Sequence, residues 1–155
     1  MIEITDNSLH DHSGELNHAA YRLGCEHYNA TNFYMASTAF VESLEYWPED
    51  PQAWMALGNC FDEIGNPKEA EYCYRKSVEL SPGKDISKVR YNLANSIFDQ
   101  NRFEEAIILY RMIPEDDPVS NQAQKNLTLA IDLLRKQNAE QVADDQLPSR
   151  IESET

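Results

Sequence analysis

An internal repeat constrains the fold of this chain more than any other feature of its sequence. The matching positions, each pair 34 residues apart, are Leu23-Gly24 and Leu57-Gly58, Ala36 and Ala70, Phe40 and Tyr74, Ser43 and Ser77, and Pro48 and Pro82. A third copy follows with two residues added, at Leu93-Ala94, Ala106, Tyr110 and Pro118. A period of this length predicts an array of small units, each of which buries its apolar face against its neighbours.

Each copy contains two segments whose apolar residues follow a helical period. In the middle copy Trp54, Leu57, Phe61 and Ile64 form one stripe, and Ala70, Tyr74, Ser77 and Leu80 form the next. The small residues Gly58 and Ala70 would let the two helix axes approach closely. The repeat unit is therefore predicted to be a helix hairpin.

Turn and capping residues fall between these segments. Asp50-Pro51 supplies an N-cap oxygen and a proline for the first helical turn, and Gly65-Asn66-Pro67 separates the paired helices. In the third copy the second helix should begin near Phe103 and be the shortest, because Pro114 comes early. A final helix over about 118–140 presents Ala123, Leu127, Ala130, Ile131 and Leu134 on one face, and Leu129-Ala130 lies 36 residues beyond Leu93-Ala94.

The middle copy reads Trp54-x-x-Leu57-Gly58-x-x-Phe61, then Ala70-x-x-x-Tyr74 and Pro82, which resembles the tetratricopeptide repeat. The resemblance covers about residues 17–118. The first copy departs from the pattern at Ala20 and His27, and the third at Arg90 and Ile97. The resemblance implies an all-α fold, a right-handed superhelical stack of three helix hairpins plus a C-terminal capping helix.

These limits give a simple domain organisation. Residues 1–14 are predicted to be a flexible acidic tail, and residues 141–155 a disordered one, because both are poor in large apolar side chains. The repeat domain would occupy 15–140. Its repeats would lie at about 17–50, 51–84 and 87–120, with the capping helix at about 118–140.

Charge and cysteine content restrict the classes of partner. The formal net charge of −14 disfavours binding to nucleic acid and to anionic membrane surfaces. Cys25, Cys60 and Cys73 have neither a disulfide framework nor a zinc spacing, and no apolar window is long enough to cross a membrane. We therefore expect a cytoplasmic protein with reduced thiols.

Catalytic motifs are absent from the sequence. It contains no glycine-rich phosphate loop, no Gly-x-Ser-x-Gly and no His-Glu-x-x-His. The pair His10-x-His12 could chelate a metal weakly, but histidines of a polar tail are the simpler interpretation. The prediction is that the protein is not an enzyme and has no cofactor and no resident metal.

The first helices of stacked hairpins line a concave groove that this fold uses to hold partners. Helical phase assigns twelve residues to it: His18, Tyr21, Cys25 and Tyr28; Gln52, Met55, Asn59 and Asp62; Lys88, Tyr91, Asn95 and Phe98. Asn59 and Asn95 hold equivalent places, where their amides could bond a bound backbone or simply face solvent.

Between Arg22 and Lys68 lie 45 residues without a Lys or Arg. A basic peptide or helix of a partner protein would be attracted to this acidic half, although acidity for solubility alone is also consistent with it. Some proteins of this family clamp a C-terminal carboxylate with Lys, Asn and Arg. Here only Lys88 matches that set and Asn92 stands in place of the Arg, which argues against this type of recognition.

Four functions are compatible with these observations. The first is a non-enzymatic adaptor or scaffold that binds another polypeptide in its groove. The second, from architecture, is a cytosolic chaperone of the type III secretion translocator kind. The third is a self-assembling scaffold, with a homodimer as its simplest form, and an enzyme is the least supported.

Overall fold

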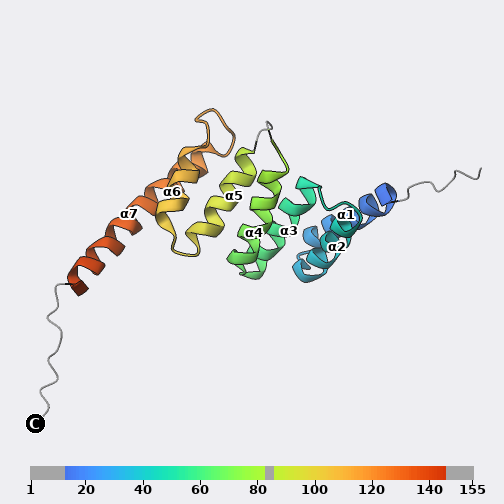
Figure 1. Cartoon of the computed structure of the whole chain (residues 1–155), viewed down its shortest axis with the longest axis horizontal. Helices are drawn as coiled ribbons and strands as arrows, with labels where there is room; N and C mark the ends of the chain where they lie inside the picture. The colour runs from blue at the N-terminus through green and yellow to red at the C-terminus, as the bar shows by residue number, and fades with distance from the viewer. Residues whose placement is uncertain (1–12, 83–85, 146–155) are drawn as a thin grey trace, which may run out of the picture.

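The computed structural model describes residues 13–82 and 86–145, and within them the chain forms only helices. The helices are α1 (Ser13–Asn29), α2 (Phe33–Tyr46), α3 (Pro51–Ile64), α4 (Pro67–Glu79), α5 (Ser87–Phe98), α6 (Phe103–Arg111) and α7 (Ser120–Asp145). Three hairpins, α1–α2, α3–α4 and α5–α6, stack in chain order, and α7 follows as a single helix (Figure 1). This is the all-α right-handed stack with a capping helix that the repeat predicts.

The turn inside each hairpin depends on one residue in the left-handed region. These residues are Thr31 (φ 61°), Gly65 (φ 85°) and Asn101 (φ 60°), which are 34 and 36 residues apart. Glycine adopts this conformation freely and asparagine tolerates it, whereas a β-branched side chain is strained there. The first turn is thus less favourable than the other two.

Close packing within a hairpin depends on a small residue in the first helix. A Cβ atom at Gly58 would lie 2.6 Å from Cε1 of Tyr74, and one at Gly24 would lie 2.6 Å from Cε1 of Phe40. Both rings are buried. The prediction that a small side chain at Gly58 lets the two helices approach is confirmed.

In the first two hairpins, repeated serines hold the end of the second helix to the start of the first. The hydroxyl of Ser77 donates to the carbonyl oxygen of Pro51 at 2.7 Å, and that of Ser43 donates to the carbonyl oxygen of Asn17 at 3.2 Å. Both serines are buried, so these bonds satisfy hydroxyls that would otherwise cost free energy to bury.

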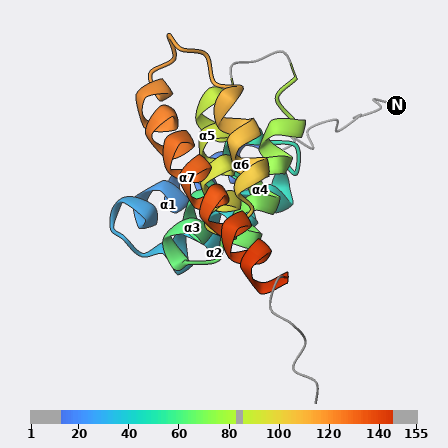
Figure 2. The same cartoon turned by 90° about the vertical axis from the view of Figure 1, so that its left-hand side faces the viewer.

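Leucines at equivalent positions seal the interfaces between successive hairpins. Leu57, Leu93 and Leu127 are 4%, 3% and 8% exposed on α3, α5 and α7. The last interval is therefore 34 residues, and the assignment of Leu129 as the partner of Leu93 is wrong, because Leu129 is 49% exposed. Helix α7 covers α6 as predicted for a cap (Figure 2).

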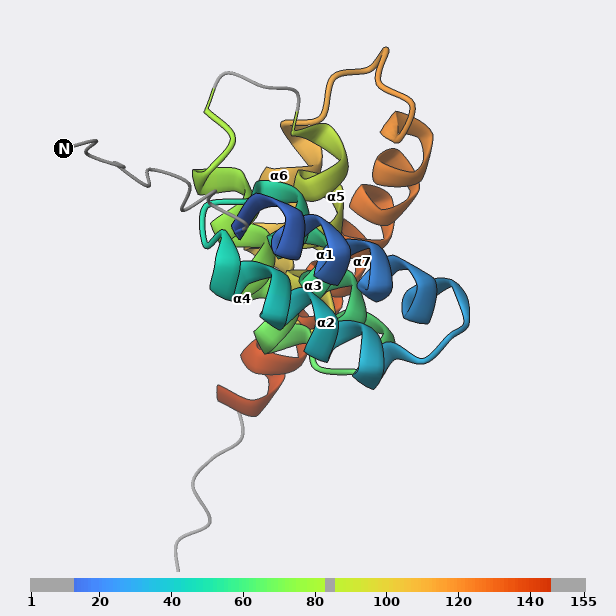
Figure 3. The same cartoon turned by 90° about the vertical axis from the view of Figure 1, so that its right-hand side faces the viewer.

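The two ends of the stack differ. Leu23, equivalent to Leu57, is 43% exposed, and α1 lies with α2 at the near end in Figure 3. At the other end α7 begins at Ser120 rather than Pro118 and continues to Asp145, past the predicted boundary at 140, with residues 135–145 exposed (Figure 1). The start of the predicted C-terminal tail, 141–145, is thus helical and forms the exposed end of α7. The end of the predicted N-terminal tail, residues 13 and 14, belongs to α1. The rest of both predicted tails, 1–12 and 146–155, lies outside the described residues.

Candidate partner-binding groove

The first helices lie together along one side of the stack. Helix α3 contacts α5, and α5 contacts α7, in addition to the contacts of α3 with α4 and of α5 with α6. All twelve residues assigned to the groove are exposed or half-buried, on helices whose other faces carry buried residues such as Ala53, Leu57, Cys60 and Leu93. A continuous polar and aromatic surface therefore follows the first helices.

The asparagines of this surface take part in a hydrogen-bond ladder between hairpins. Asn59 Oδ1 accepts from the Tyr74 hydroxyl at 2.9 Å and from Asn92 Nδ2 at 3.0 Å. Each bond joins α3 to a different helix, α4 or α5. The carbonyl oxygen of Asn59 is thus used inside the protein.

The same arrangement occurs one repeat later. Asn95 Oδ1 accepts from the Tyr110 hydroxyl at 2.6 Å and from Asn126 Nδ2 at 2.9 Å. The roles of Asn92 and Asn126 escaped the sequence reasoning, although their 34-residue spacing was visible. The hypothesis that Asn59 and Asn95 hold a bound backbone now concerns only their amide nitrogens.

The first interface replaces the ladder by apolar groups. The residues in phase with Asn59, Tyr74 and Asn92 are Cys25, Phe40 and Ala56. Phe40 is buried, and Cys25 and Ala56 pack against its cluster. A phenylalanine without a hydroxyl thus accompanies a cysteine in place of the asparagine, so that neither hydrogen-bonding group is left unpaired.

Asp62 lies beside the hydrogen bonds of Asn59. Its Oδ2 accepts from the Tyr74 hydroxyl at 2.6 Å. Burial raises the pKa of Asp62 to about 6, with smaller contributions from Asp99 and Glu63, while the bond from Tyr74 lowers it. Because one hydroxyl hydrogen serves one acceptor at a time, Tyr74 divides its donation between Asp62 and Asn59. Burial also raises the pKa of Tyr74, so this hydroxyl keeps its proton.

Each aromatic residue of the groove rests against a ring of a second helix. The pairs, with ring-centroid distances, are Tyr21–Phe40 (5.4 Å), Tyr28–Phe33 (5.2 Å), Tyr91–Tyr110 (6.2 Å) and Phe98–Phe103 (5.3 Å). One face of each groove ring is supported from behind, so the rings present fixed, half-exposed surfaces. Rings held in this way lose little conformational entropy on contact with a partner.

Three of the predicted groove residues line one cavity of about 280 Å³. Gln52 and Met55 of α3 face Lys88 of α5 there, with Ser77 and Val89 among the remaining lining residues. The structure thus brings the second and third repeats together at this point. His18 is exposed on α1 and does not line this cavity.

The thiols of the hairpin cores are unreactive. Burial raises the pKa of Cys60 and of Cys73 to about 12, so both remain protonated thiols at neutral pH. Cys25 is half-buried in the groove. Within residues 13–82 and 86–145, no cluster of three or more His, Cys, Asp and Glu side chains could hold a metal ion. The pair His10-x-His12 lies outside these ranges.

A charged network on the second helices was not foreseen. Glu71 accepts from Arg75 at 2.8 Å, from Arg102 at 2.6 Å and from Gln100 at 2.7 Å. Burial raises the pKa of Glu71, but these hydrogen bonds outweigh it and hold the pKa below its usual value. Glu105 also pairs with both arginines, so the network ties the second hairpin to the third.

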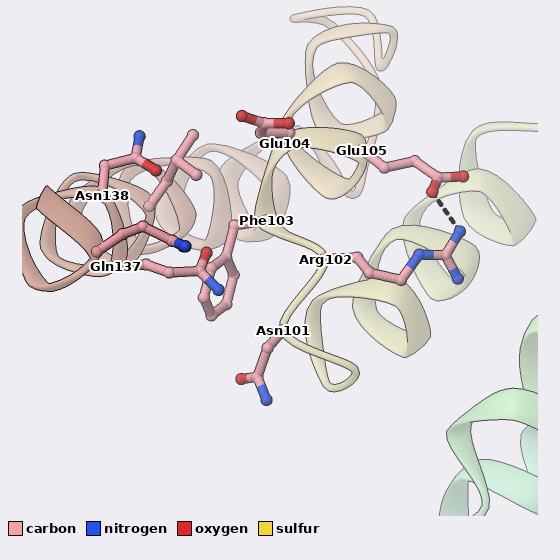
Figure 4. A pocket seen from close by; sticks show the side chains of 9 residues that line it. Asn101, Arg102, Phe103, Glu104, Glu105, Gln137 and Asn138 are labelled. Carbon is pink, nitrogen blue, oxygen red and sulfur yellow. Dashed lines mark hydrogen bonds and ion pairs between the residues drawn. The ribbon is translucent and has the colours of Figure 1, made fainter. Parts of the chain in front are cut away.

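A polar cavity of about 380 Å³ lies between the α5–α6 turn and α7. Figure 4 shows Arg102, Glu104 and Glu105 on one side and Gln137 and Asn138 of α7 on the other. Its mixed charges and amides give it little apolar surface to offer a ligand.

Comparison with known proteins agrees with this geometry. The family model described as tetratricopeptide repeat matches residues 21–85. Residues 21–85 are thus tetratricopeptide repeat, and the helical stack that the structure describes has the same fold. Among curated proteins it is 33% identical over 108 residues to the human protein O-mannosyl-transferase TMTC3. That match covers 61% of this chain and 12% of TMTC3.

Two solved structures illustrate the fold. The TPR2B domain of yeast Sti1, in its pHsp70 complex, has a TM-score of 0.70 at 14% identity and covers 76% of this chain and 98% of that domain. SycD, the type III secretion translocator chaperone of Yersinia enterocolitica, has a TM-score of 0.67 at 17% identity. That match covers 80% of this chain and 88% of SycD. At these identities the similarity is one of fold. Within the described ranges no helix of this chain is both long and apolar enough to cross a bilayer.

Proposed function

We propose that this tetratricopeptide-repeat protein is a non-enzymatic adaptor of the cytoplasm that binds a peptide or helical segment of a partner protein in the groove of its first helices. The observation that carries the proposal is the burial pattern. Residues of α3 and α5 that face neighbouring helices are buried, whereas the groove positions, including four aromatic rings, remain accessible. Supported aromatic side chains are typical of interaction surfaces.

The charge distribution supports a basic partner segment. Asp62 lies in the groove, and the acidic run that extends from Glu26 to Glu63 contains no Lys or Arg. Electrostatic attraction of this kind raises association rates and weakens as salt screens it. The peptide complex named for the Sti1 domain is consistent with binding in such a groove.

The test compares two exposed or half-exposed apolar residues on opposite helices. Met55 lies in the groove on α3, and Ile108 is 58% exposed on α6, a second helix. The tagged chain is used to capture a partner from lysate, and the identified partner is then titrated against Met55→Glu and Ile108→Glu. Because Met55 also packs against the core, the melting temperature of each variant is measured first, and binding is titrated where the variant is folded. We expect folded Met55→Glu to weaken binding at least tenfold and Ile108→Glu to leave it unchanged. The opposite result would place the partner on the second helices.

Arg75 and the two groove asparagines are unsuitable for this comparison. Arg75 belongs to the Glu71 network, and Asn59 and Asn95 join hairpins, so substitutions there change stability as well as any surface. Lys76, which is half-exposed on α4, is a second control, because its ion pair with Glu79 stays within that helix.

The similarity to SycD favours one alternative, a chaperone for a secreted translocator protein. Co-expression separates the two functions: a chaperone should keep a large apolar translocator soluble, whereas an adaptor should have no such effect. Self-assembly, including a homodimer, would appear as a sedimentation coefficient that rises with protein concentration.

A further inference from the structure

An apolar cavity of about 410 Å³ lies between the turn of the first hairpin and the end of α3. Phe33, Tyr34 and Met35 of α2 form one wall, and Ile64 and Glu63 of α3 form the other. We call it the Phe33 pocket. A cavity of this volume accommodates a large amino-acid side chain.

A hydrogen-bonded amide occupies the corresponding place at the next interface. Gln100 stands 36 residues after Ile64, and its Nε2 donates to Glu71 at 2.7 Å and to the carbonyl oxygen of Ser96 at 3.0 Å. At the third interface Leu134 holds the position, and the cavity there is lined by charged and amide groups (Figure 4). The Phe33 pocket is thus the apolar member of a series built on the same scaffold.

The rim of this pocket exposes unusually large apolar side chains. Tyr34 is 72% exposed and Met35 is 56% exposed, both in the first turn of α2. In the next repeat Lys68 and Glu69 occupy these two positions. Solvent therefore faces an aromatic ring and a flexible thioether where the next hairpin presents charges, which is typical of a surface that contacts a partner.

The pocket continues the groove. Tyr28 of the groove packs its ring on Phe33 at 5.2 Å, and its hydroxyl donates to Glu63 Oε1 at 3.5 Å. Tyr28 thus lies between the groove and the Phe33 pocket. A bound segment that follows α1 and α3 can pass Tyr28 and enter the pocket.

Charge selects the type of residue that would enter. Among the residues that line the Phe33 pocket, Glu63 carries the formal charge, and the sequence holds no Lys or Arg between Arg22 and Lys68. An apolar side chain would fill the volume, and a cation beside it would meet the Glu63 carboxylate. We propose that the Phe33 pocket binds an apolar side chain of a partner segment whose neighbouring residue is Lys or Arg. This rests on the proposed function, since it extends the groove.

Two dipeptide amides test the recognition directly. N-acetyl-Leu-Lys-amide and N-acetyl-Leu-Glu-amide are titrated into the full chain, and binding is followed by the NMR signals of the Met35 and Ile64 methyl groups. We expect the Lys peptide to shift these signals and to bind about fivefold more tightly than the Glu peptide, the upper range for an exposed ion pair. Glu63→Gln should abolish the difference. Equal binding of the two peptides to the wild type, or shifts confined to other parts of the chain, would overturn the proposal.

Variants at the rim separate this proposal from the function itself. Met35→Glu is placed on an exposed position and should leave the melting temperature unchanged, and Met35→Leu should restore binding of the Lys peptide. With an identified partner in hand, loss of binding in Met55→Glu but full binding in Met35→Glu would refute the pocket and leave the groove standing. Full binding in both variants would refute the groove as well. If Met35→Glu instead dissociates an oligomer of the wild type, the occupant is a second copy and the proposal is wrong.

Discussion

Replacing Gly58 by leucine tests the packing of the repeat most directly. A single Cβ atom at this position would already lie 2.6 Å from Cε1 and 2.8 Å from Cδ1 of Tyr74, distances at which a neighbour must shift. The ring has little freedom to move, because it is 1% exposed and its hydroxyl donates to Asp62 and Asn59. Gly58→Leu must therefore separate α3 from α4 or break these bonds.

The magnitude follows from two opposing contributions. Overpacking a core costs about 1–3 kcal/mol, and displacing Tyr74 also removes hydrogen bonds worth about 1 kcal/mol each. Leucine is a better helix former than glycine by about 0.8 kcal/mol, which offsets part of the loss. We expect a net loss of about 3 kcal/mol in the free energy of unfolding, or about 6–12 °C in melting temperature for a chain of this size.

Thr128→Leu is the matched control. Thr128 lies 34 residues after Ala94, the position in α5 that corresponds to Gly58, but it is exposed because no second helix follows α7 within the described residues. Leucine there should be neutral or stabilise by a few tenths of a kcal/mol through helix propensity. The assay is urea unfolding followed by circular dichroism. Equal midpoints for Gly58→Leu and Thr128→Leu would refute the close approach of the hairpin helices.

Three further predictions test other parts of the structure. Thr31→Gly should raise the free energy of unfolding by about 1 kcal/mol in thermal melts, because it relieves a β-branched residue at positive φ, whereas Gly65→Thr should lower it. Leu57→Ala should lower the free energy of unfolding in urea by about 2–4 kcal/mol, because Leu57 is buried, whereas Leu23→Ala should lower it by less than about 1 kcal/mol. Similar losses for the two variants would mean that the exposed face of α1 is covered in solution. In the folded state the pKa of Asp62 is about 6, above its ordinary 3.8, so the folded state binds the proton more tightly than the unfolded state. The free energy of unfolding should therefore fall as the pH rises from 3.8 to 6, and stay low at higher pH. Asp62→Asn should therefore raise the melting temperature at pH 7.5 but not at pH 4, and a pH-independent effect would contradict the assignment.

The sequence was sufficient for the architecture because the repeat is specified by steric requirements. Gly58 must be small, Tyr74 must be large, and Asp50-Pro51 must begin a helix, so each copy reads in phase with the next. Helix α6, the second helix of the third hairpin, was predicted to be the shortest because of Pro114. At 9 residues it is the shortest of the described helices. The error at Leu129 arose because a fixed offset of 36 was carried past the irregular segment before α7, where the interval returns to 34.

The candidate site was less accessible from sequence. Helical phase identifies which side chains leave the core, but it does not show which of them are bonded to a neighbouring repeat. Asn59 and Asn95 look like ligands on a helical wheel, and only the structure shows Asn92 and Asn126 bonded to them. The Phe33 pocket was missed for a related reason, since it lies at a turn, where two repeats meet and no single helical period applies.

The asparagine ladder and the Phe33 pocket lie at different interfaces of the stack. At the second and third interfaces, the hydrogen bonds from Asn92 to Asn59 and from Asn126 to Asn95 fix the register of neighbouring helices, because a shift would leave polar groups unpaired. At the first interface the equivalent residues Cys25, Phe40 and Ala56 form no such ladder, and the hydrogen bond between α1 and α3 is the long one from Tyr28 to Glu63, at 3.5 Å. The same interface carries the Phe33 pocket, the strained turn at Thr31 and the acidic run. The proposed Phe33 pocket therefore lies at the interface that lacks the asparagine ladder, whereas at the other two interfaces the ladder joins neighbouring helices.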